Sequence, residues 1–458
     1  MTMIQIRMTG TLDYRQTKQH IPHAFTVPDG ATVLKIWFDY SPKWSRGQEQ
    51  RNDLSLTLFD PEGARGARHN NQDRNLRITA QSATPGYTPG TLQPGTWVIW
   101  IDSHRILPPD RVEYRFEIEI STELLSADEP VMYWQPGQVA PRGAGWYRGD
   151  LHGHTWHSDG KWDIPDFVRY ARKYELDFVT LTDHNTVSGL AQIDSLATDD
   201  LLTMGGIELT TYYGHALALG TRQWLEWRIQ PGITMPMIAE QVKKAGALFI
   251  IAHPHSIGDP YCTGCDWNYN DMLPGNARCV EIWNGDWGGD SGNEDTVQLW
   301  YRWLNQGYRM VATAGTDIHS IMDVDNLHPG FNVVYAAELS QSAILQAIRV
   351  GHLYLSGGPR LELTAQNEAG QTAMMGDTLD GETLTINVNW KDCQPGDTLR
   401  LIVNGQVRET LPLNNGGEQQ WTIAASECHW CVVEIRAPDG IMRAITNPIF
   451  AGTAADWN

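Results

Sequence analysis

Residues 150–160 read DLHGHTWHSDG and place three histidines and two aspartates in one short stretch. Imidazole and carboxylate groups crowded in this way compete or repel one another unless a shared partner organises them, and a divalent metal ion is the commonest such partner. We therefore expect other parts of the chain to supply further metal ligands.

Other histidines and carboxylates directly follow short apolar segments. VTLT precedes Asp183 and His184, LFIIA precedes His253, VEIW precedes Asn284, and VATAGT leads to Asp317 and His319. In α/β barrels the carboxyl ends of the strands, and the loops after them, form the active site. These segments therefore predict that the ligands lie together at the rim formed by the carboxyl ends of the strands of an α/β domain.

Glu208 in GGIELTT and His215 in YGHALALG complete a set of nine candidate metal ligands. The set consists of His152, His154, Asp159, His184, Glu208, His215, His253, Asp317 and His319. Six histidines and three carboxylates exceed what one tetrahedral zinc or one octahedral ion takes, so we expect two or three divalent ions. Glu208 is the natural bridge, because its two oxygens can bind two cations. Zinc, manganese and iron all suit these mixed ligands.

Such a centre predicts hydrolysis of a small anionic substrate. Three divalent ions outweigh three carboxylates and a bridging hydroxide, so the pocket favours a phosphate ester, which a metal-bound hydroxide would attack. A carboxylic ester, carbamate or amide is the alternative substrate, and a non-catalytic metal-stabilised scaffold is a third possibility. A cationic rim would favour phosphate, and Lys161, Arg222 and Arg228 are the nearest basic residues.

The pattern along the chain predicts three domains. Residues 1–145 show partial alternation of apolar and polar residues between turn signals, which predicts a β-sandwich. Residues 146–357 alternate helix-period segments with strands that are apolar on both faces, which favours parallel strands in a barrel or a doubly wound sheet. Residues 358–458 predict a small C-terminal β-domain. A Pro- and Gly-containing linker from Val131 joins the first two domains.

The flanking β-domains contain no cluster of chemically active residues that the sequence reveals. We expect them to cover the mouth of the barrel or to form a contact between copies of the chain, and either arrangement would let them influence specificity. A homo-oligomer formed through these domains is therefore one expectation.

Six ordered motifs resemble those of the PHP (polymerase and histidinol phosphatase) metallohydrolases: DLHGHTWHSDG, TLTDHNT, GIELTT, GHALALG, IAHPH and AGTDIHS. With a β-domain on each side, the chain is similar to the CehA/McbA branch, which is named after a carbamate insecticide hydrolase. The resemblance covers about residues 146–357. It implies a distorted (β/α)7 barrel and a centre of two or three metal ions, and most members of the superfamily cleave phosphoesters.

The resemblance also implies how the ligands are shared. His152 and His154 would hold one ion with Glu208 and Asp317. Asp159 and His184 would hold a second ion, again with Glu208, and the other three ligands complete the set: His215, His253 and His319.

Several residues of the motifs have a second interpretation. We assign catalytic roles to His215, His253 and Asp183, although Asp183 is also suited to orienting the backbone or a ligand. Candidates for substrate contact are His157, His255, Asn284 and Trp283. Their alternatives are support behind the ligands for the histidines, loop capping for Asn284, and ordinary packing for Trp283, since the chain has 19 tryptophans.

The composition excludes some partners. The 34 basic and 54 acidic residues give a formal net charge of −20, and no Lys/Arg run could follow a nucleic-acid backbone. No apolar stretch is long enough to span a membrane, and the start of the chain does not resemble a secretory signal, so we expect a cytoplasmic protein. Cys262 and Cys265 form a C-x-x-C, for which reduced thiols, a local disulfide, and a metal or redox role are all open.

Overall fold

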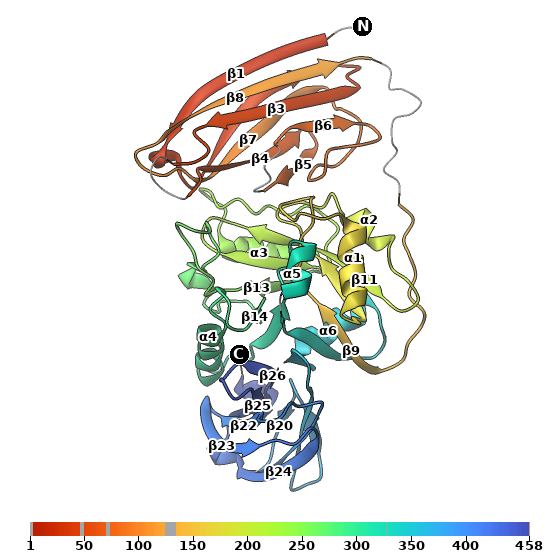
Figure 1. Ribbon diagram of the computed structural model, residues 1–458, viewed down its shortest axis with the longest axis vertical. Helices are drawn as coiled ribbons and strands as arrows, with labels where there is room; N and C mark the ends of the chain where they lie inside the picture. The colour runs from red at the N-terminus through yellow and green to blue at the C-terminus, as the bar shows by residue number, and fades with distance from the viewer. Residues whose placement is uncertain (1–2, 46–49, 70–73, 124–133, 327, 458) are drawn as a thin grey trace.

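The computed structural model describes residues 3–45, 50–69, 74–123, 134–326 and 328–457. Residues 131–133 of the predicted linker lie outside these ranges. Three bodies of structure follow one another along the longest axis, with the N-terminal strands at one end and the C-terminal strands at the other (Figure 1). None of the helices in the described part of the chain is long and apolar enough to cross a membrane.

The N-terminal strands form two facing four-stranded sheets. The outer sheet contains, in order, β1 (Met3–Asp13), β8 (Arg111–Ser121), β3 (Val33–Ser41) and β6 (Leu76–Thr79). The inner sheet contains β2 (Gln19–Val27), β7 (Gly95–Arg105), β4 (Asp53–Asp60) and β5 (Gly63–Arg68). Alternate residues such as Leu34 and Ile36 from one sheet, and Leu56 and Ile99 from the other, share one core. This is the expected β-sandwich, and its inner sheet faces the middle of the molecule (Figure 1).

The middle of the chain contains a curved run of strands with helices packed against it. The strands are β9 (Gly145–Asp150), β10 (Phe178–Leu181), β11 (Leu202–Thr210), β12 (His215–Leu219), β13 (Leu248–Ile251), β14 (Cys279–Asn284) and β15 (Val311–Gly315). The helices are α1 (Ile164–Lys173), α2 (Leu190–Asp194), α3 (Met235–Lys244), α4 (Asn293–Asn305), α5 (Ile321–Asn326) and α6 (Gln341–Val350).

Local signals set the ends of these helices. The Asp163 side chain accepts a hydrogen bond from the Asp166 amide and caps α1, and Ser340 caps α6 in the same way. Gly351 ends α6 at a φ of 84°, a left-handed conformation that glycine adopts without strain.

The sheet is mixed, which corrects the expectation of parallel strands alone. β12 pairs antiparallel with both β11 and β13, whereas the other neighbours from β9 to β15 are parallel. Only residues 211–214 connect β11 to β12, and so short a connection permits an antiparallel pair but no crossover. The predicted strand NVVYAA is β16 (Phe331–Ala336), and it also pairs antiparallel, with β9 and with β17 (Leu353–Ser356).

The two ends of this run meet just beyond the carboxyl ends of β9 and β15. The Asp317 amide donates to the His152 carbonyl (3.0 Å), and the His154 amide donates to the Ile318 carbonyl (2.9 Å). Within β15, the Asn332 side chain accepts a hydrogen bond from the Ala314 amide and donates one to the Ala314 carbonyl. Side chains thus satisfy backbone groups that a complete ladder would otherwise pair. The strands therefore curl until their ends touch, while a regular (β/α)7 barrel stays a prediction.

The C-terminal part continues the same large sheet. β17 pairs with β26 (Met442–Thr446), and the order continues through β25 (Trp430–Arg436), β22 (Thr398–Val403) and β23 (Gln406–Pro412). β20 (Thr378–Leu379) and β27 (Ile449–Ala451) pair beside this path. A separate four-stranded sheet contains β19 (Thr372–Met374), β18 (Arg360–Asn367), β21 (Thr383–Lys391) and β24 (Gly417–Ala424). The predicted domain boundaries at residues 145 and 357 stay predictions.

Candidate metal centre

The nine predicted ligands gather at the carboxyl ends of β9, β10, β13 and β15 and on the hairpin of β11 and β12. Their ligand atoms, together with those of one further residue, form four overlapping groups, and within each group all atoms lie within 4.8 Å of one another. The groups are His152, His154, Glu208 and Asp317; His154, Asp159, His184 and His319; Glu208, His215 and His253; and His152, His253 and Glu281.

Two of these groups can be compared with the predicted sharing of ligands. The first group contains the residues that the resemblance implies for one ion. The second group contains Asp159 and His184, but His154 and His319 accompany them instead of Glu208. His184 still lies close to Glu208, since its Nδ1 is 3.0 Å from Glu208 Oε2.

Glu208 lies at the centre of the ligands. Its Oε1 faces His215 Nδ1 (2.9 Å) and His253 Nε2 (3.2 Å). Its Oε2 faces Nε2 of His152 (3.1 Å) and of His154 (3.2 Å). The two oxygens therefore point to different groups, which is the geometry that a bridging carboxylate needs. β11 is buried along its whole length, so this carboxylate is held deep in the molecule.

Glu281 is a residue of the centre that the sequence interpretation missed. It projects from β14, accepts hydrogen bonds from His152 Nδ1 (3.0 Å) and from the His253 amide (3.1 Å), and is 1% exposed. A carboxylate behind a histidine fixes its tautomer and turns the other nitrogen toward the metal. The available signal was a single charged residue inside the apolar strand CVEIW, because a buried carboxylate requires partners.

Attraction between the histidines and the carboxylates of the centre outweighs burial in setting the pKa values of His152, Glu208 and His319. Burial opposes the charged form of His152, but the carboxylates of Asp317, Glu281 and Glu208 outweigh it and hold the His152 pKa well above its usual value. Burial likewise acts against ionised Glu208, yet the neighbouring histidines keep its pKa well below the usual range. For His319, burial is outweighed mainly by Asp159, and the pKa rises to about 9. Without metal, protonated histidines thus balance the carboxylates.

Several buried nitrogen and oxygen atoms that could bind a metal lack a hydrogen-bond partner among the described residues. They are Nδ1 and Nε2 of His154, Nε2 of His215 and Oδ1 of Asp317. His154 Nε2 and Asp317 Oδ1 lie 2.9 Å apart as an ion pair, but without the geometry of a full hydrogen bond. Leaving such atoms unpaired costs roughly 1–3 kcal/mol each. A shared cation would satisfy them, so the residues present fit a centre of divalent ions with nitrogen and oxygen ligands.

The backbone is strained at two ligands. His253 has a φ of 27° and Asp317 a φ of 53°, in the region that side-chain-bearing residues rarely adopt. Such conformations cost roughly 1–3 kcal/mol each and persist where the surroundings enforce them, commonly at functional sites.

Asp183 lies behind the ligands instead of among them. Its carboxylate accepts hydrogen bonds from the Thr155 amide (2.8 Å), the Thr155 hydroxyl (2.7 Å) and the Ser158 hydroxyl (2.6 Å). These bonds hold the turn that carries Asp159. The contacts favour a positioning role over the predicted catalytic role.

The four predicted substrate residues lie in different environments. His157 Nδ1 is 2.7 Å from the Ser188 hydroxyl, and His255 Nδ1 is 3.1 Å from Oγ1 of Thr296 in α4. Asn284 does border the ligands, since its Nδ2 lies 3.4 Å from Asp317 Oδ2 and donates to Glu281. Trp283 is 1% exposed and packs against Trp287, so ordinary packing accounts for it.

The basic residues and cysteines near the motifs serve other contacts. Arg222 pairs with Asp194, and Arg228 pairs with Glu226, so both of these candidates for a cationic rim are engaged by carboxylates outside the ligand groups. Cys262 and Cys265 form a disulfide, the second of the alternatives considered for this pair.

The N-terminal sandwich brings one further histidine, His69, against the centre, with His104 packed behind it, a contact that the sequence did not reveal. The His69 ring lies 4.7 Å from the His184 ring and 4.5 Å from that of His104. Burial and His104 lower the pKa of His69 well below its usual value. Neither histidine belongs to a motif, so nothing local in the sequence marked them.

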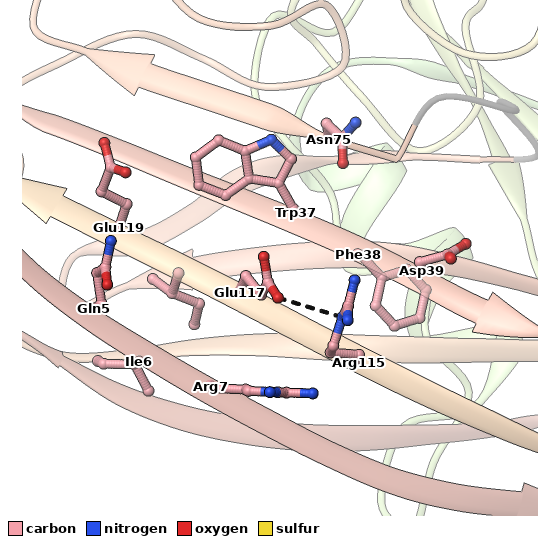
Figure 2. Close-up of a pocket in the computed structure, with 11 residues that line it drawn as sticks. Gln5, Ile6, Arg7, Trp37, Phe38, Asp39, Asn75, Arg115, Glu117 and Glu119 are labelled. Atoms are coloured by element: carbon pink, nitrogen blue, oxygen red, sulfur yellow. Dashed lines mark ion pairs between the residues drawn. The ribbon is translucent and has the colours of Figure 1, made fainter.

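A separate hollow of about 580 Å³ lies on the outer sheet of the sandwich. Figure 2 shows Trp37 and the ion pair of Arg115 and Glu117 among its lining residues. It belongs to the face that points away from the middle of the molecule (Figure 1), and it contains no predicted ligand.

Comparison with known proteins yields low overall similarity. No family model matches the chain. A two-domain protein from Bacteroides vulgatus, named as containing a "predicted PHP-like metal-dependent phosphoesterase", is 18% identical, with 69% of this chain and 99% of that chain covered and a TM-score of 0.38. An amidohydrolase from Chromobacterium violaceum, solved with sulfate and without metal, is 16% identical, with coverage of 39% and 90% and a TM-score of 0.28. These values are too low to transfer an activity.

One curated sequence is more similar. The uncharacterized protein MJ1587 of Methanocaldococcus jannaschii is 32% identical over 127 residues, which cover 25% of this chain and 70% of that protein. Through this shared segment, the chain belongs to the same family as MJ1587.

Proposed function

We propose that the protein is a metal-dependent hydrolase of the PHP type, in the CehA/McbA-like branch, and that it cleaves a small phosphate ester. The observation that carries this proposal is the set of overlapping ligand groups, which share His152, His154, Glu208 and His253 within one buried site. Overlapping groups of this kind suit two or three ions that bind close together. Zinc, manganese and iron remain the metals that fit.

Divalent ions held there would acidify a coordinated water and polarise a phosphoryl or carbonyl oxygen. The protein's own residues orient the ligands. Glu281 holds His152, the Cys265 carbonyl accepts a hydrogen bond from His253 Nδ1 (3.2 Å), and the Asp317 carbonyl accepts one from His319 Nδ1 (2.6 Å). Each bond leaves the other ring nitrogen free to act as a ligand.

Exposure indicates where substrate enters. The side chains of Asp159, Asp317 and His319 are 15%, 26% and 31% exposed, whereas those of His152 and Glu208 are at most 1% exposed. The centre therefore opens on the side of Asp317 and His319.

A neutral carbonyl substrate is the second candidate. Arg222 and Arg228 form ion pairs with Asp194 and Glu226. Because these charges are engaged there, they do not favour an anionic substrate over a neutral one. Glu281 points in the same direction, since a fourth buried carboxylate lowers the net positive charge that bound ions would create.

The test compares hydrolysis of bis-p-nitrophenyl phosphate, p-nitrophenyl phosphate, and a p-nitrophenyl carboxylate or carbamate ester. The full-length protein is reloaded with manganese or zinc and assayed beside His154→Ala. His352→Gln is the matched control, because His352 pairs with Asp377 outside the ligand groups.

We expect turnover of a phosphate ester by the reloaded protein and by His352→Gln, and none by His154→Ala, which should also bind less metal. Turnover confined to the neutral ester would establish the second candidate. Normal metal content together with normal turnover in His154→Ala would refute the proposed centre.

A further inference from the structure

The inner sheet of the N-terminal sandwich places His69 against the metal centre and His104 behind His69. His69 directly follows β5, and His104 lies near the end of β7. The His69 ring is tilted against the ring of His184 at 4.7 Å, and Asp159 and His215 also lie within its electrostatic reach. His69 therefore borders two of the ligand groups from the side of the sandwich.

Hydrogen bonds fix the sandwich on one side of His69. The Gly86 amide donates to the Ser188 hydroxyl (2.8 Å), and the Thr186 hydroxyl donates to the Gly86 carbonyl (2.7 Å). Gly86 has a φ of 96°, and a Cβ there would lie 3.0 Å from the His157 carbonyl. Glycine is thus required for the sandwich to approach this loop so closely.

Other contacts fix the opposite side. The Tyr212 hydroxyl donates to the Gln19 carbonyl (3.1 Å), and Lys18 Nζ lies 2.6 Å from Asp259 Oδ2. The Thr263 hydroxyl also donates to the His104 carbonyl (3.4 Å). Because contacts flank the histidines on both sides, His69 and His104 have defined positions over the centre.

Aromatic stacking completes this contact. The Arg228 guanidinium lies over Phe59 (4.5 Å) and over Trp100 (4.7 Å), and Phe59 packs edge-on against Trp224. Arg228, a candidate for the cationic rim in the sequence, therefore joins the two parts of the protein.

Each of the two histidines has one ring nitrogen without a hydrogen bond. Nδ1 of His69 and Nδ1 of His104 are buried, and neither has a hydrogen-bond partner among the described residues. His104 uses its Nε2, which lies 2.8 Å from the Ser55 hydroxyl. An unpaired buried nitrogen is costly, and at His69 this nitrogen belongs to a ring that contacts a ligand histidine.

We propose that the N-terminal sandwich contributes to the substrate site and that His69 hydrogen-bonds an oxygen of a phosphoryl group held at the metal centre. The inference rests on the proposed function for its substrate class. Since the ligands come from the middle of the chain, the sandwich would add recognition of the substrate without adding a ligand.

The experiment measures the binding of inorganic phosphate to the manganese-loaded, full-length protein by calorimetry. His69→Ala and His69→Asn are compared with wild type, and His23→Ala on β2 serves as the control histidine in the same sandwich. Metal content is measured by mass spectrometry, and KM and kcat are measured with bis-p-nitrophenyl phosphate.

We expect His69→Ala to weaken phosphate binding by about tenfold or more, as for loss of a hydrogen bond to a charged group. The metal content should be unchanged, and KM should rise more than kcat falls. His69→Asn keeps an N–H group near the position of Nδ1, so it should restore part of the affinity, and it serves as the test variant if the alanine variant does not fold. His23→Ala should bind phosphate as wild type does.

Unchanged phosphate affinity in both His69 variants would overturn the inference, as would loss of metal in both or a wild-type protein that binds no phosphate. Failure of the proposed function gives a different result. Weaker phosphate binding in His69→Ala, with no ester hydrolysed by wild type, would support the role of His69 and refute the hydrolase.

Discussion

The charges of the metal centre predict different pH responses for the metal-free and the metal-loaded protein. In the metal-free chain the pKa of His319 is raised from 6.5 to about 9. A raised histidine pKa adds stability that is complete below pH 6.5 and is lost as pH rises through about 9. Burial is likewise outweighed at Asp159 and Asp317, whose pKa values are lowered by neighbouring histidines. Their contribution is present above the usual aspartate range and is lost only in acid.

The size of the effect follows from the His319 pKa. A rise from 6.5 to about 9 corresponds to about 3 kcal/mol of stability by linkage. Since 31% of the side chain is exposed, solvent screening reduces this to about 1–2 kcal/mol. At about 2–4 °C per kcal/mol for a domain of this size, the metal-free Tm should fall by several degrees between pH 6.5 and pH 9.

Metal removes this slope, because an ion bound at His319 would take the place of its proton, and the unfolded histidine is also unprotonated above pH 6.5. Below pH 9, affinity for the ion should rise about tenfold per pH unit for each proton displaced. Metal-loaded protein should therefore gain stability relative to metal-free protein across the same range.

Thermal unfolding of chelator-treated and manganese-loaded protein at half-unit steps from pH 6 to pH 9 measures both slopes. His319→Gln should reduce the metal-free slope without abolishing it, because the pKa values of His152 and His184 are also raised, and His352→Gln should leave the slope unchanged. Parallel curves for the two forms, or a metal-free Tm that rises toward pH 9, would refute this account of the charges.

Three substitutions test the residues behind the ligands. Glu281→Gln removes the carboxylate that orients His152, so metal affinity should fall about 10–100-fold in chelator competition, and an unchanged affinity would show that this support is dispensable. Gly315→Ala places a Cβ 2.0 Å from Glu281 Oε1 and 2.4 Å from the His152 Cβ, so we expect loss of metal and about 1–3 kcal/mol of stability; normal metal content would contradict the tight packing. Asp183→Asn weakens the hydrogen bonds that hold residues 155–158 and should cost about 1–3 kcal/mol in urea denaturation. Native stability without turnover would instead restore the catalytic role of Asp183.

The supporting residues explain why the ligands need a large fold. His152 depends on Glu281 of β14, and the turn before Asp159 depends on Asp183 after β10. These two ligands are thus held by residues of strands other than their own. Such support is what keeps buried groups with opposing charges in one arrangement while no ion is bound.

The sequence alone predicted the nine candidate ligands and most of the element types. Two kinds of signal are local properties of the chain: the periodicity of strands and helices, and the position of His184, His253 and Asp317 soon after apolar segments. They depend on near neighbours in the chain and are therefore readable without a structure. The same locality made the β-sandwich recognisable.

Only the tertiary structure decided how these parts combine. The direction of β12 follows from its pairing with β11 and β13, and the role of Glu281 depends on the strand that brings it beneath His152. His69 reaches His184 because two folded surfaces dock, through contacts as distant in sequence as Gly86 with Ser188. Docking depends on the complementarity of whole surfaces, and no short stretch of sequence records that property.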